Sequence, residues 1–212
     1  MKVKVCGITN QADAALAADE GADLIGLVLH RGPRRVDLRT ARDIVRRLPR
    51  TVEAVGLFQD QPIDEMKSAL AETGLAAAQL NGQEPPDVAA ALGVRVIKTF
   101  TTFTNESLER LRRYDTYAFL LDVPRGATGR SRIDLDWAVV AKKVGRVIAS
   151  GRLTPEDLFD IVRKLRPWAV DAGAWTEIVP GRKDRMKVRA FVQAARAAHA
   201  DTERIRVKVV AR

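Results

Sequence analysis

The sequence predicts an α/β protein folded as one compact barrel of eight βα units. Eight short apolar runs suited to buried strands alternate with eight longer segments of helical character. The units recur roughly every 25 residues, which favours right-handed crossovers that close into a parallel (β/α)8, or TIM, barrel. An open doubly wound sheet is the rival architecture, but the glycine-rich first turn typical of that fold is absent from the chain.

The predicted strands are short and mostly apolar throughout, as expected where both faces of a sheet are buried. The first alternates basic and apolar residues and ends at Cys6, which is followed at once by Gly7. The expected strands are, in chain order, Val3–Cys6, Leu24–Leu29, Val52–Phe58, Ala76–Leu80, Val94–Thr99, Tyr117–Asp122, Val144–Ser150 and Trp168–Asp171.

The predicted helices lie between these runs, and several carry apolar residues at helical spacing. Leu38, Ala41 and Ile44 form one such stripe. Helix starts are indicated by Asn10 and by the run Thr154-Pro155-Glu156. The expected helices are Ala12–Glu20, Asp37–Arg47, Ile63–Thr73, Asp87–Leu92, Ser107–Tyr114, Asp134–Lys142, Pro155–Leu165 and Lys183–Ala198.

The chain has the size of one large domain, with 212 residues and 46% hydrophobic content. We expect the barrel to occupy residues 1–199 and a basic C-terminal tail to occupy residues 200–212. In that tail Ile205, Val207 and Val209 alternate with other residues, so a short strand and a disordered arm both fit the pattern.

A single cysteine excludes an intrachain disulfide and suggests a reducing compartment. No run approaches the roughly 18 apolar residues of a membrane span, and Met1 leads directly into strand residues without a signal peptide. We therefore expect a cytoplasmic protein with no membrane partner.

The formal net charge of +9 raises the question of a nucleic-acid partner. The arginines are spread through predicted helices, however, and aromatic residues make up only 5% of the chain. No basic patch interleaved with aromatics appears, so we expect no nucleic-acid binding. The positive field suits a small polyanionic substrate instead.

Chemistry is expected at the carboxyl ends of the strands, where barrel enzymes place their active sites. Cys6 ends the first strand and Asp122 ends the sixth, so a thiol and a carboxylate face one mouth. Such a pair suits proton transfer between adjacent carbons, with one group as base and the other as acid. No metal-ligand spacing is present, and no cofactor is expected.

Other strand ends supply candidates for substrate binding. Glycines after the seventh and eighth strands lie where barrels commonly hold a phosphate against backbone amides. The candidate substrate-binding residues are Arg34, Gln79, Ser150, Gly151, Arg152, Asp171, Gly173 and Ala174.

An ordered series of short motifs, spanning residues 4 to about 192, resembles the phosphoribosylanthranilate isomerase family of tryptophan biosynthesis. The motifs are Lys4-Val5-Cys6-Gly7-Ile8-Thr9, Pro33-Arg34, Val55-Gly56-Leu57-Phe58, Gln79-Leu80-x-Gly82, Leu120-Leu121-Asp122, Thr128-Gly129, Asp136-Trp137, Leu153-Thr154-Pro155-Glu156-Asp157 and Pro180-Gly181-x-Lys183-Asp184.

The resemblance implies an Amadori rearrangement of a small phosphosugar without metal or cofactor. It makes Asp122 the general acid that opens the furanose ring and Cys6 the general base that removes the proton from C2 of the sugar. It places Arg34 on the anthranilate carboxylate, where a planar guanidinium fits, and Asp171 on a sugar hydroxyl. The chain would work as a monomer or a homodimer.

The sequence departs from the family pattern mainly in the predicted phosphate loops. Gly151-Arg152 stands where the family usually has two glycines, and Gly173-Ala174-Trp175 replaces Ser-Ser-Gly. If the last position requires positive φ, Trp175 is costly there unless the loop has moved. Asn81 replaces a histidine, and Ala127 replaces a glycine of the loop after Asp122.

Two other functions fit the same chain. One is a paralogue with a remodelled phosphate site that acts on a different substrate, and the other is a non-catalytic basic barrel that binds a polyanion. An isomerase of histidine biosynthesis fits less well, because it carries a carboxylate where Cys6 stands.

Each candidate residue also has a purely structural interpretation. Asp122 and Asp171 fit turn caps, where aspartate is common. Gln79 fits a strand-end amide, and Arg34 fits an arginine-rich surface segment.

Overall fold

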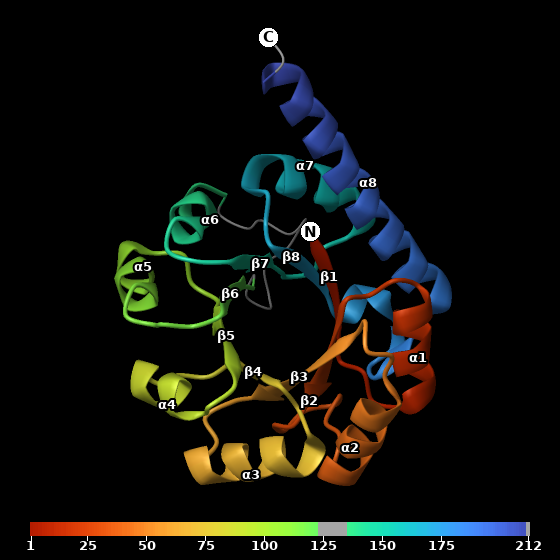
Figure 1. Ribbon diagram of the computed structural model, residues 1–212, viewed down its shortest axis with the longest axis vertical. Helices are drawn as coiled ribbons and strands as arrows, with labels where there is room; N and C mark the ends of the chain where they lie inside the picture. The colour runs from red at the N-terminus through yellow and green to blue at the C-terminus, as the bar shows by residue number, and fades with distance from the viewer. Residues whose placement is uncertain (123–134, 211–212) are drawn as a thin grey trace.

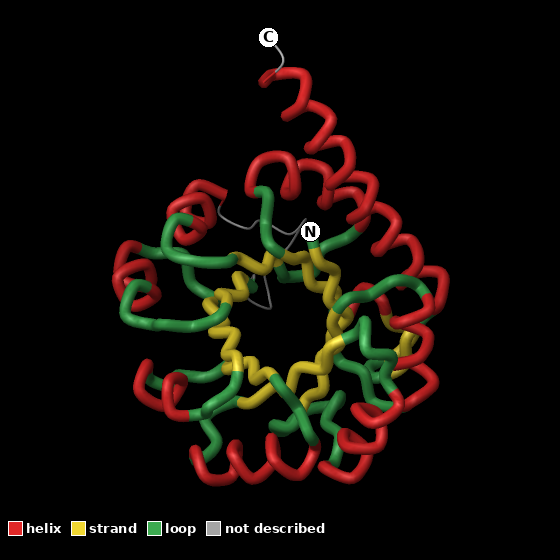
Figure 2. Tube along the Cα trace, viewed as in Figure 1, coloured by secondary structure: helices red, strands yellow, loops and turns green. Residues whose placement is uncertain are grey.

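The computed structural model describes residues 1–122 and 135–210 and confirms the predicted barrel. Eight parallel strands close in sequence order, each paired with the next and β8 paired with β1. Figure 2 shows the ring of strands inside a ring of helices. The strands are β1 (Lys2–Cys6), β2 (Leu24–Val28), β3 (Glu53–Phe58), β4 (Ala77–Leu80), β5 (Arg95–Phe100), β6 (Ala118–Leu121), β7 (Val147–Ala149) and β8 (Ala169–Ala172).

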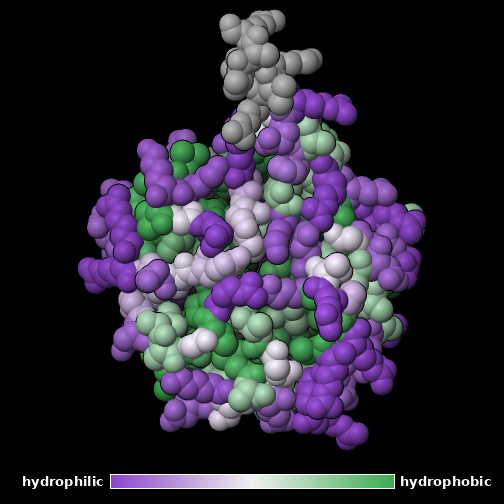
Figure 3. All heavy atoms as spheres, in the orientation of Figure 1, coloured by the Kyte–Doolittle hydropathy of each residue, from purple (hydrophilic) through white to green (hydrophobic). Residues whose placement is uncertain are grey.

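The helices that surround the strands follow the predicted order (Figure 1). They are α1 (Gln11–Asp19), α2 (Leu38–Arg47), α3 (Ile63–Thr73), α4 (Pro86–Ala91), α5 (Asn105–Leu111), α6 (Leu135–Lys142), α7 (Pro155–Leu165) and α8 (Arg185–Val210). Several starts are fixed by side-chain caps, as at Asn10, whose side chain accepts from the N–H of Asp13. On the face seen in Figure 3, hydrophilic side chains cover the periphery of the molecule.

Strand β7 is shorter than the predicted run Val144–Ser150. The N–H groups of Val144 and Gly145 both donate to the Ala141 carbonyl, so these residues complete the turn that follows α6. A local turn therefore replaces strand pairing at an apolar residue, which the hydrophobic pattern alone does not distinguish.

The barrel has two apolar layers, one on each face of its sheet. Outward residues such as Val5 and Phe58 pack in a large core beneath the helices. Inward residues such as Leu24, Val55 and Leu120 fill the barrel itself. Because side chains alternate along a strand, Lys4 and Cys6 share the inner face of β1.

A small hairpin between β8 and α8 was not predicted. The 3-10 turn η1 (Ala174–Thr176) leads into β9 (Glu177–Val179), which pairs antiparallel with β10 (Arg182–Lys183). Gly181, with φ of +82°, lies in the turn between the two strands. Lys183, which was predicted to begin the last helix, belongs to β10 instead.

The last helix does not end near residue 199, as the predicted tail required. Helix α8 continues to Val210, so residues 200–210 are helical rather than a strand or an arm. Thr202 is buried, and its hydroxyl donates to the Ala198 carbonyl 2.9 Å away, which continues the helix through the expected boundary. Figure 1 shows α8 packed beside α7 and running past the ring of helices to the C-terminus.

Candidate active site

The inner face of the barrel changes from apolar to polar toward the carboxyl ends of the strands. The apolar layer formed by residues such as Ala77, Ile148 and Ala169 is followed, two positions further along each strand, by polar side chains. Among the described residues, the polar side chains that face inward near the mouth include those of Lys4, Cys6, Gln79, Thr99, Ser150 and Asp171.

The Cys6 thiol lies against a space that only glycine leaves open. A Cβ atom on Gly26 of β2 would stand 2.8 Å from the Cys6 Sγ and 3.1 Å from the Lys4 Nζ. The first separation is shorter than real Cβ contacts and the second is tighter than most, so a side chain at this position would displace the thiol and crowd the ammonium. Glycine at position 26 of β2 therefore leaves room for both the Cys6 thiol and the Lys4 ammonium.

A buried hydrogen-bonded chain underlies the thiol. The Lys4 Nζ donates to the Asp171 Oδ1 at 3.0 Å, and the Ser150 Oγ donates to the Asp171 Oδ2 at 3.0 Å. The Lys4 ammonium and the Cys6 thiol also interact electrostatically, since each favours the charged form of the other. The three strands β1, β7 and β8 thus bring together four of the polar residues at the mouth.

The electrostatics of this group balance burial against charge. Burial raises the pKa of the Cys6 thiol above its usual value, while the Lys4 and Lys183 ammonium groups oppose that rise. Burial also disfavours the charged form of Lys4, but the Asp171 carboxylate and Cys6 outweigh it and raise the Lys4 pKa. Lys4 is therefore a fixed cation inside the barrel.

Arg34 is held by the hairpin rather than exposed on the surface. Its Nε donates to the Glu177 Oε1 at 2.8 Å, and its Nη2 donates to the Glu177 Oε2 at 2.6 Å. Glu177 also accepts from the Lys183 Nζ at 3.2 Å. Although burial alone would raise the pKa of Glu177, these two cations lower it overall. Within the described residues the Arg34 Nη1 has no partner, so this edge of the guanidinium remains free for a ligand.

Gly7 is required by this arrangement for two reasons. Its φ is +80°, and a Cβ there would lie 2.6 Å from the Arg34 Cδ. The Cys6-Gly7 pair therefore places the thiol at the mouth and lets Arg34 pass directly beside it.

Gln79 contributes a buried amide with an unpaired oxygen. Its Nε2 donates to the Asn81 Oδ1 at 2.9 Å, and the Thr99 Oγ1 donates to the same oxygen at 2.7 Å. The Gln79 Oε1 has no hydrogen-bond partner among the described residues, although the side chain is almost fully buried. An orphaned acceptor at a barrel mouth is suited to a donor from a ligand.

The rim over β7 and β8 offers backbone donors. Within the described part of the chain, the N–H groups of Gly151, Arg152, Gly173 and Ala174 have no protein acceptor. Gly151 and Arg152 both have positive φ, of 95° and 53°, so Arg152 keeps the left-handed backbone expected of a glycine. Unpaired N–H groups clustered in a loop form a natural anion site.

Trp175 does not take the positive-φ backbone that a glycine at this position would allow. It lies in η1, and its φ is not positive. Its ring packs against Phe191 of α8, with ring centroids 6.4 Å apart. The indole therefore belongs to the junction of the hairpin with α8.

Asp122 follows directly after β6. Its N–H donates to the Phe100 carbonyl at 2.9 Å, so the pairing of β6 with β5 continues to this residue. Leu120, two positions earlier, faces the barrel interior, and strand alternation gives Asp122 the same side. The predicted loop motif at residues 126–129 lies outside the described residues.

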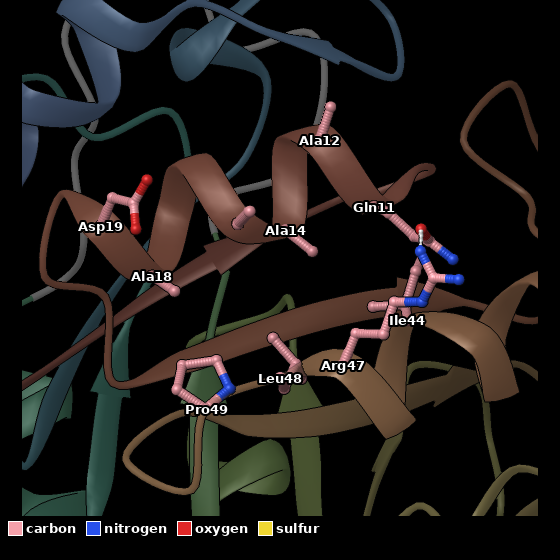
Figure 4. A pocket seen from close by; sticks show the side chains of 10 residues that line it. Gln11, Ala12, Ala14, Ala18, Asp19, Ile44, Arg47, Leu48 and Pro49 are labelled. Atoms are coloured by element: carbon pink, nitrogen blue, oxygen red, sulfur yellow. Dashed lines mark hydrogen bonds between the residues drawn. The ribbon is translucent and has the colours of Figure 1, made fainter.

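A separate groove of about 630 Å³ lies on the outside of the barrel between α1 and α2. Figure 4 shows Gln11 and Arg47 hydrogen-bonded across one end of it, with Ala18 and Leu48 nearer the other end. None of the predicted site residues lines this groove.

Three residues of the site were not singled out from the sequence as functional, namely Lys4, Glu177 and Lys183. All three are charged and almost fully buried. Lys4 and Lys183 belong to motifs noted in the sequence. The signal that could have identified Lys4 is its position two residues before Cys6, because side chains two positions apart lie on the same face of a strand.

The fold and the site together define an acid–base enzyme of the (β/α)8-barrel class, with its chemistry at the carboxyl ends of the strands. Residues 3–194 match the family model of N-(5'phosphoribosyl)anthranilate (PRA) isomerase. The chain is 40% identical over 202 residues to the N-(5'-phosphoribosyl)anthranilate isomerase of Geobacter metallireducens, which covers 93% of this chain and 100% of the relative. The chain belongs to the phosphoribosylanthranilate isomerase family.

Solved structures of this family have the same fold as this chain. The enzyme of Thermus thermophilus superimposes with a TM-score of 0.84 at 37% identity, over 93% of this chain and 99% of the other. A second family structure, in complex with reduced 1-(o-carboxyphenylamino)-1-deoxyribulose 5-phosphate, has a TM-score of 0.84 at 29% identity, with the same coverage of 93% and 99%. No helix within the described residues is both long and apolar enough to cross a membrane.

Proposed function

We propose that this enzyme catalyses the Amadori rearrangement of N-(5-phosphoribosyl)anthranilate in tryptophan biosynthesis, with Cys6 and Asp122 as its proton carriers. The observation that carries the assignment of these roles is the Cys6 thiol at the barrel mouth, beside a fixed cation. The family membership supplies the reaction, since its members are isomerases of this substrate.

The proposed chemistry begins with a proton from Asp122. The Asp122 carboxylic acid protonates the furanose ring oxygen, the C1–O bond breaks, and the nitrogen lone pair forms a C1=N iminium. The Cys6 thiolate then removes the proton from C2. The electrons of the C2–H bond form a C1=C2 bond, and the iminium nitrogen takes up the displaced pair. The resulting enaminol tautomerises to the 1-amino-1-deoxyketose.

Arg34 is the proposed partner of the anthranilate carboxylate. Its Nε and Nη2 are held by Glu177, which fixes the plane of the guanidinium. Among the described residues no group binds the Nη1 edge, which leaves it for a carboxylate oxygen, and a guanidinium already held in place loses little entropy on binding.

The rim over β7 and β8 is the proposed phosphate site. The N–H groups of Gly151, Arg152, Gly173 and Ala174 supply donors without any hydroxyl side chain. The exposed Arg152 guanidinium adds a positive charge. In this proposal Asp171, already accepting from Lys4 and Ser150, meets a sugar hydroxyl, and the free Gln79 Oε1 accepts from the substrate.

The paralogue hypothesis rests on the remodelled phosphate loops, of which the bulkiest change, Trp175, packs against Phe191 of α8. The assay that separates the three functions measures isomerisation of phosphoribosylanthranilate generated in situ. We expect turnover by the unmodified protein and a loss of about 10²–10⁴-fold for Cys6→Ala and for Asp122→Asn.

Asp160→Asn, on the exposed part of α7, is the matched control and should retain full activity. Full activity of Cys6→Ala would overturn the proposed base. No turnover by the unmodified protein would favour the paralogue, and steeply salt-dependent binding of a polyanion without turnover would favour the non-catalytic barrel.

The proposed assembly is a monomer or a homodimer, to be decided by light scattering after size-exclusion chromatography. The Thermotoga maritima member of the family is described as dimeric. The proposed compartment is the cytoplasm, because a catalytic thiol must remain reduced.

A further inference from the structure

Lys4 is a buried charge that lies beside the proposed general base. It is 0% exposed, lies on the inner face of β1, and precedes Cys6 by two positions. An ammonium group in a protein interior is costly unless it is paired. A cation at this depth therefore requires a reason.

Its surroundings connect it to the thiol. The Lys4 Nζ and the Cys6 Sγ lie 3.1 Å and 2.8 Å from the same point, the place of a missing Cβ on Gly26. The ammonium donates to the Asp171 Oδ1 at 3.0 Å, and the nearby Cys6 thiol also favours its charged form. Within the described residues Lys4 is ion-paired with one carboxylate, that of Asp171, and the Cys6 thiol lies beside the same ammonium.

We infer that the Lys4 ammonium is the counter-charge of the Cys6 thiolate, a positioning residue that favours the ionised base against the effect of burial and directs it into the barrel mouth. The inference rests on the proposed role of Cys6 as general base. When the thiolate accepts the C2 proton it becomes neutral, and Lys4 remains paired with Asp171. The same contact then favours loss of that proton at the end of the cycle.

The other charged groups near Cys6 do not fill this role. Lys183 of β10 donates to the Cys6 backbone carbonyl at 2.6 Å, and also to Gly173, Thr176 and Glu177, so its protons are directed elsewhere. Arg34, from the loop after β2, is bound to Glu177. Asp171 of β8 is negative and opposes the thiolate.

A second buried lysine provides a matched control. Lys98 of β5 is also 0% exposed, but it faces outward and donates to Glu84, Gly82 and Leu80. Its hydrogen bonds are thus satisfied without any titratable thiol. Removing its charge should destabilise the protein without affecting Cys6.

The test is the pH dependence of alkylation of Cys6 by iodoacetamide, which reports one site because the chain has a single cysteine. We expect Lys4→Met to raise the midpoint of the alkylation profile by about one pH unit or more, and so to slow alkylation near neutral pH about tenfold. Lys4→Arg should recover part of that shift. Lys98→Met should leave the midpoint unchanged.

An unchanged midpoint in folded Lys4→Met would overturn the inference, even if turnover falls, because a merely structural role would lower turnover alone. If Lys4→Met does not fold, Asp171→Asn provides the second measurement. Removal of the opposing carboxylate should lower the midpoint, and a midpoint that does not fall would count against the inference. Alkylation needs no substrate, so failure here is distinct from failure of the proposed function, which the Cys6→Ala assay tests.

Discussion

Two sides of the barrel mouth are built in different ways. Over β1, β2 and the hairpin, side chains hold one another, since Glu177 binds both Arg34 and Lys183. Over β7 and β8, the rim consists of backbone, and the N–H groups of Gly151, Arg152, Gly173 and Ala174 have no acceptor among the described residues. The first side depends on particular side chains, and the second depends on the path of the main chain.

This difference explains where the sequence departs from the family pattern. Arg152 and Gly173 replace family residues on the backbone side, where any residue that keeps the chain path keeps the N–H donors. On the hairpin side each charge has a fixed, buried partner, so a change there leaves another charge unpaired. The predictions below test this contrast.

The largest effect is expected for Glu177→Gln. It leaves the buried Lys183 and the partly buried Arg34 without their carboxylate, and should lower the free energy of unfolding by about 3 kcal/mol. Urea denaturation measures the change. Glu109→Gln, which removes an exposed pair with Arg112, is the control and should cost less than about 1 kcal/mol. Equal losses of stability in the two variants would contradict the proposal that the hairpin side depends on its buried charge pairs.

Lowering the pH should also destabilise the hairpin side of the mouth, by a smaller amount that follows the protonation of Glu177. The pKa of Glu177 is lowered in the folded protein, so its carboxylate stabilises the fold at pH values above its unfolded pKa. That stability is lost as pH falls through the folded pKa. Unfolding free energy measured against pH should show an acid limb that Glu177→Gln makes shallower, and an identical limb in both proteins would refute the assignment.

Arg34→Lys should reduce substrate binding rather than stability. A lysine retains charge but cannot bind Glu177 through two donors while presenting a third edge to a carboxylate. We expect KM to rise about tenfold, equivalent to about 1.4 kcal/mol, with kcat changed less. Steady-state kinetics test this, and an unchanged KM would show that Arg34 does not bind the substrate carboxylate.

Arg152→Gly should affect the backbone side in two opposite ways. Glycine accepts the positive φ of 53° without strain, so the variant should be more stable by up to about 1 kcal/mol. Loss of the guanidinium should raise KM several-fold if Arg152 adds charge to the phosphate site. Thermal unfolding and kinetics separate the two effects, and an unchanged KM would assign phosphate binding to backbone donors alone.

The smallest effect is expected for Gly173→Ser. A Cβ at Gly173 would meet no atom within 4 Å, although the backbone there, with φ of −112° and ψ of −102°, lies outside the regions that other residues prefer. The free energy of unfolding should fall by about 1 kcal/mol because of this backbone conformation, while the new hydroxyl should lower KM. A large loss of stability, measured by urea denaturation, would show that the backbone side is less tolerant than proposed.

Much of the fold was predictable because local patterns specify it. The alternation of apolar runs with helical stripes predicted all eight barrel strands in order, and Cys6 was recognised from its place at a strand end. Predictions were wrong where local signals were ambiguous. Val144 continued a strand-like run but belongs to a turn, and alternating Ile205 and Val207 suggested a strand inside what is a helix.

The sequence alone thus determined the barrel, the order of its strands and the residues at their ends, because periodicity and strand alternation are properties of neighbouring residues. Only the tertiary structure decided which charges meet. Lys4 and Asp171 are 167 positions apart, and Arg34 and Glu177 are 143 apart. Closure of the barrel joins β8 to β1, and the hairpin brings its carboxylate to Arg34. Such pairings depend on the path of the whole chain.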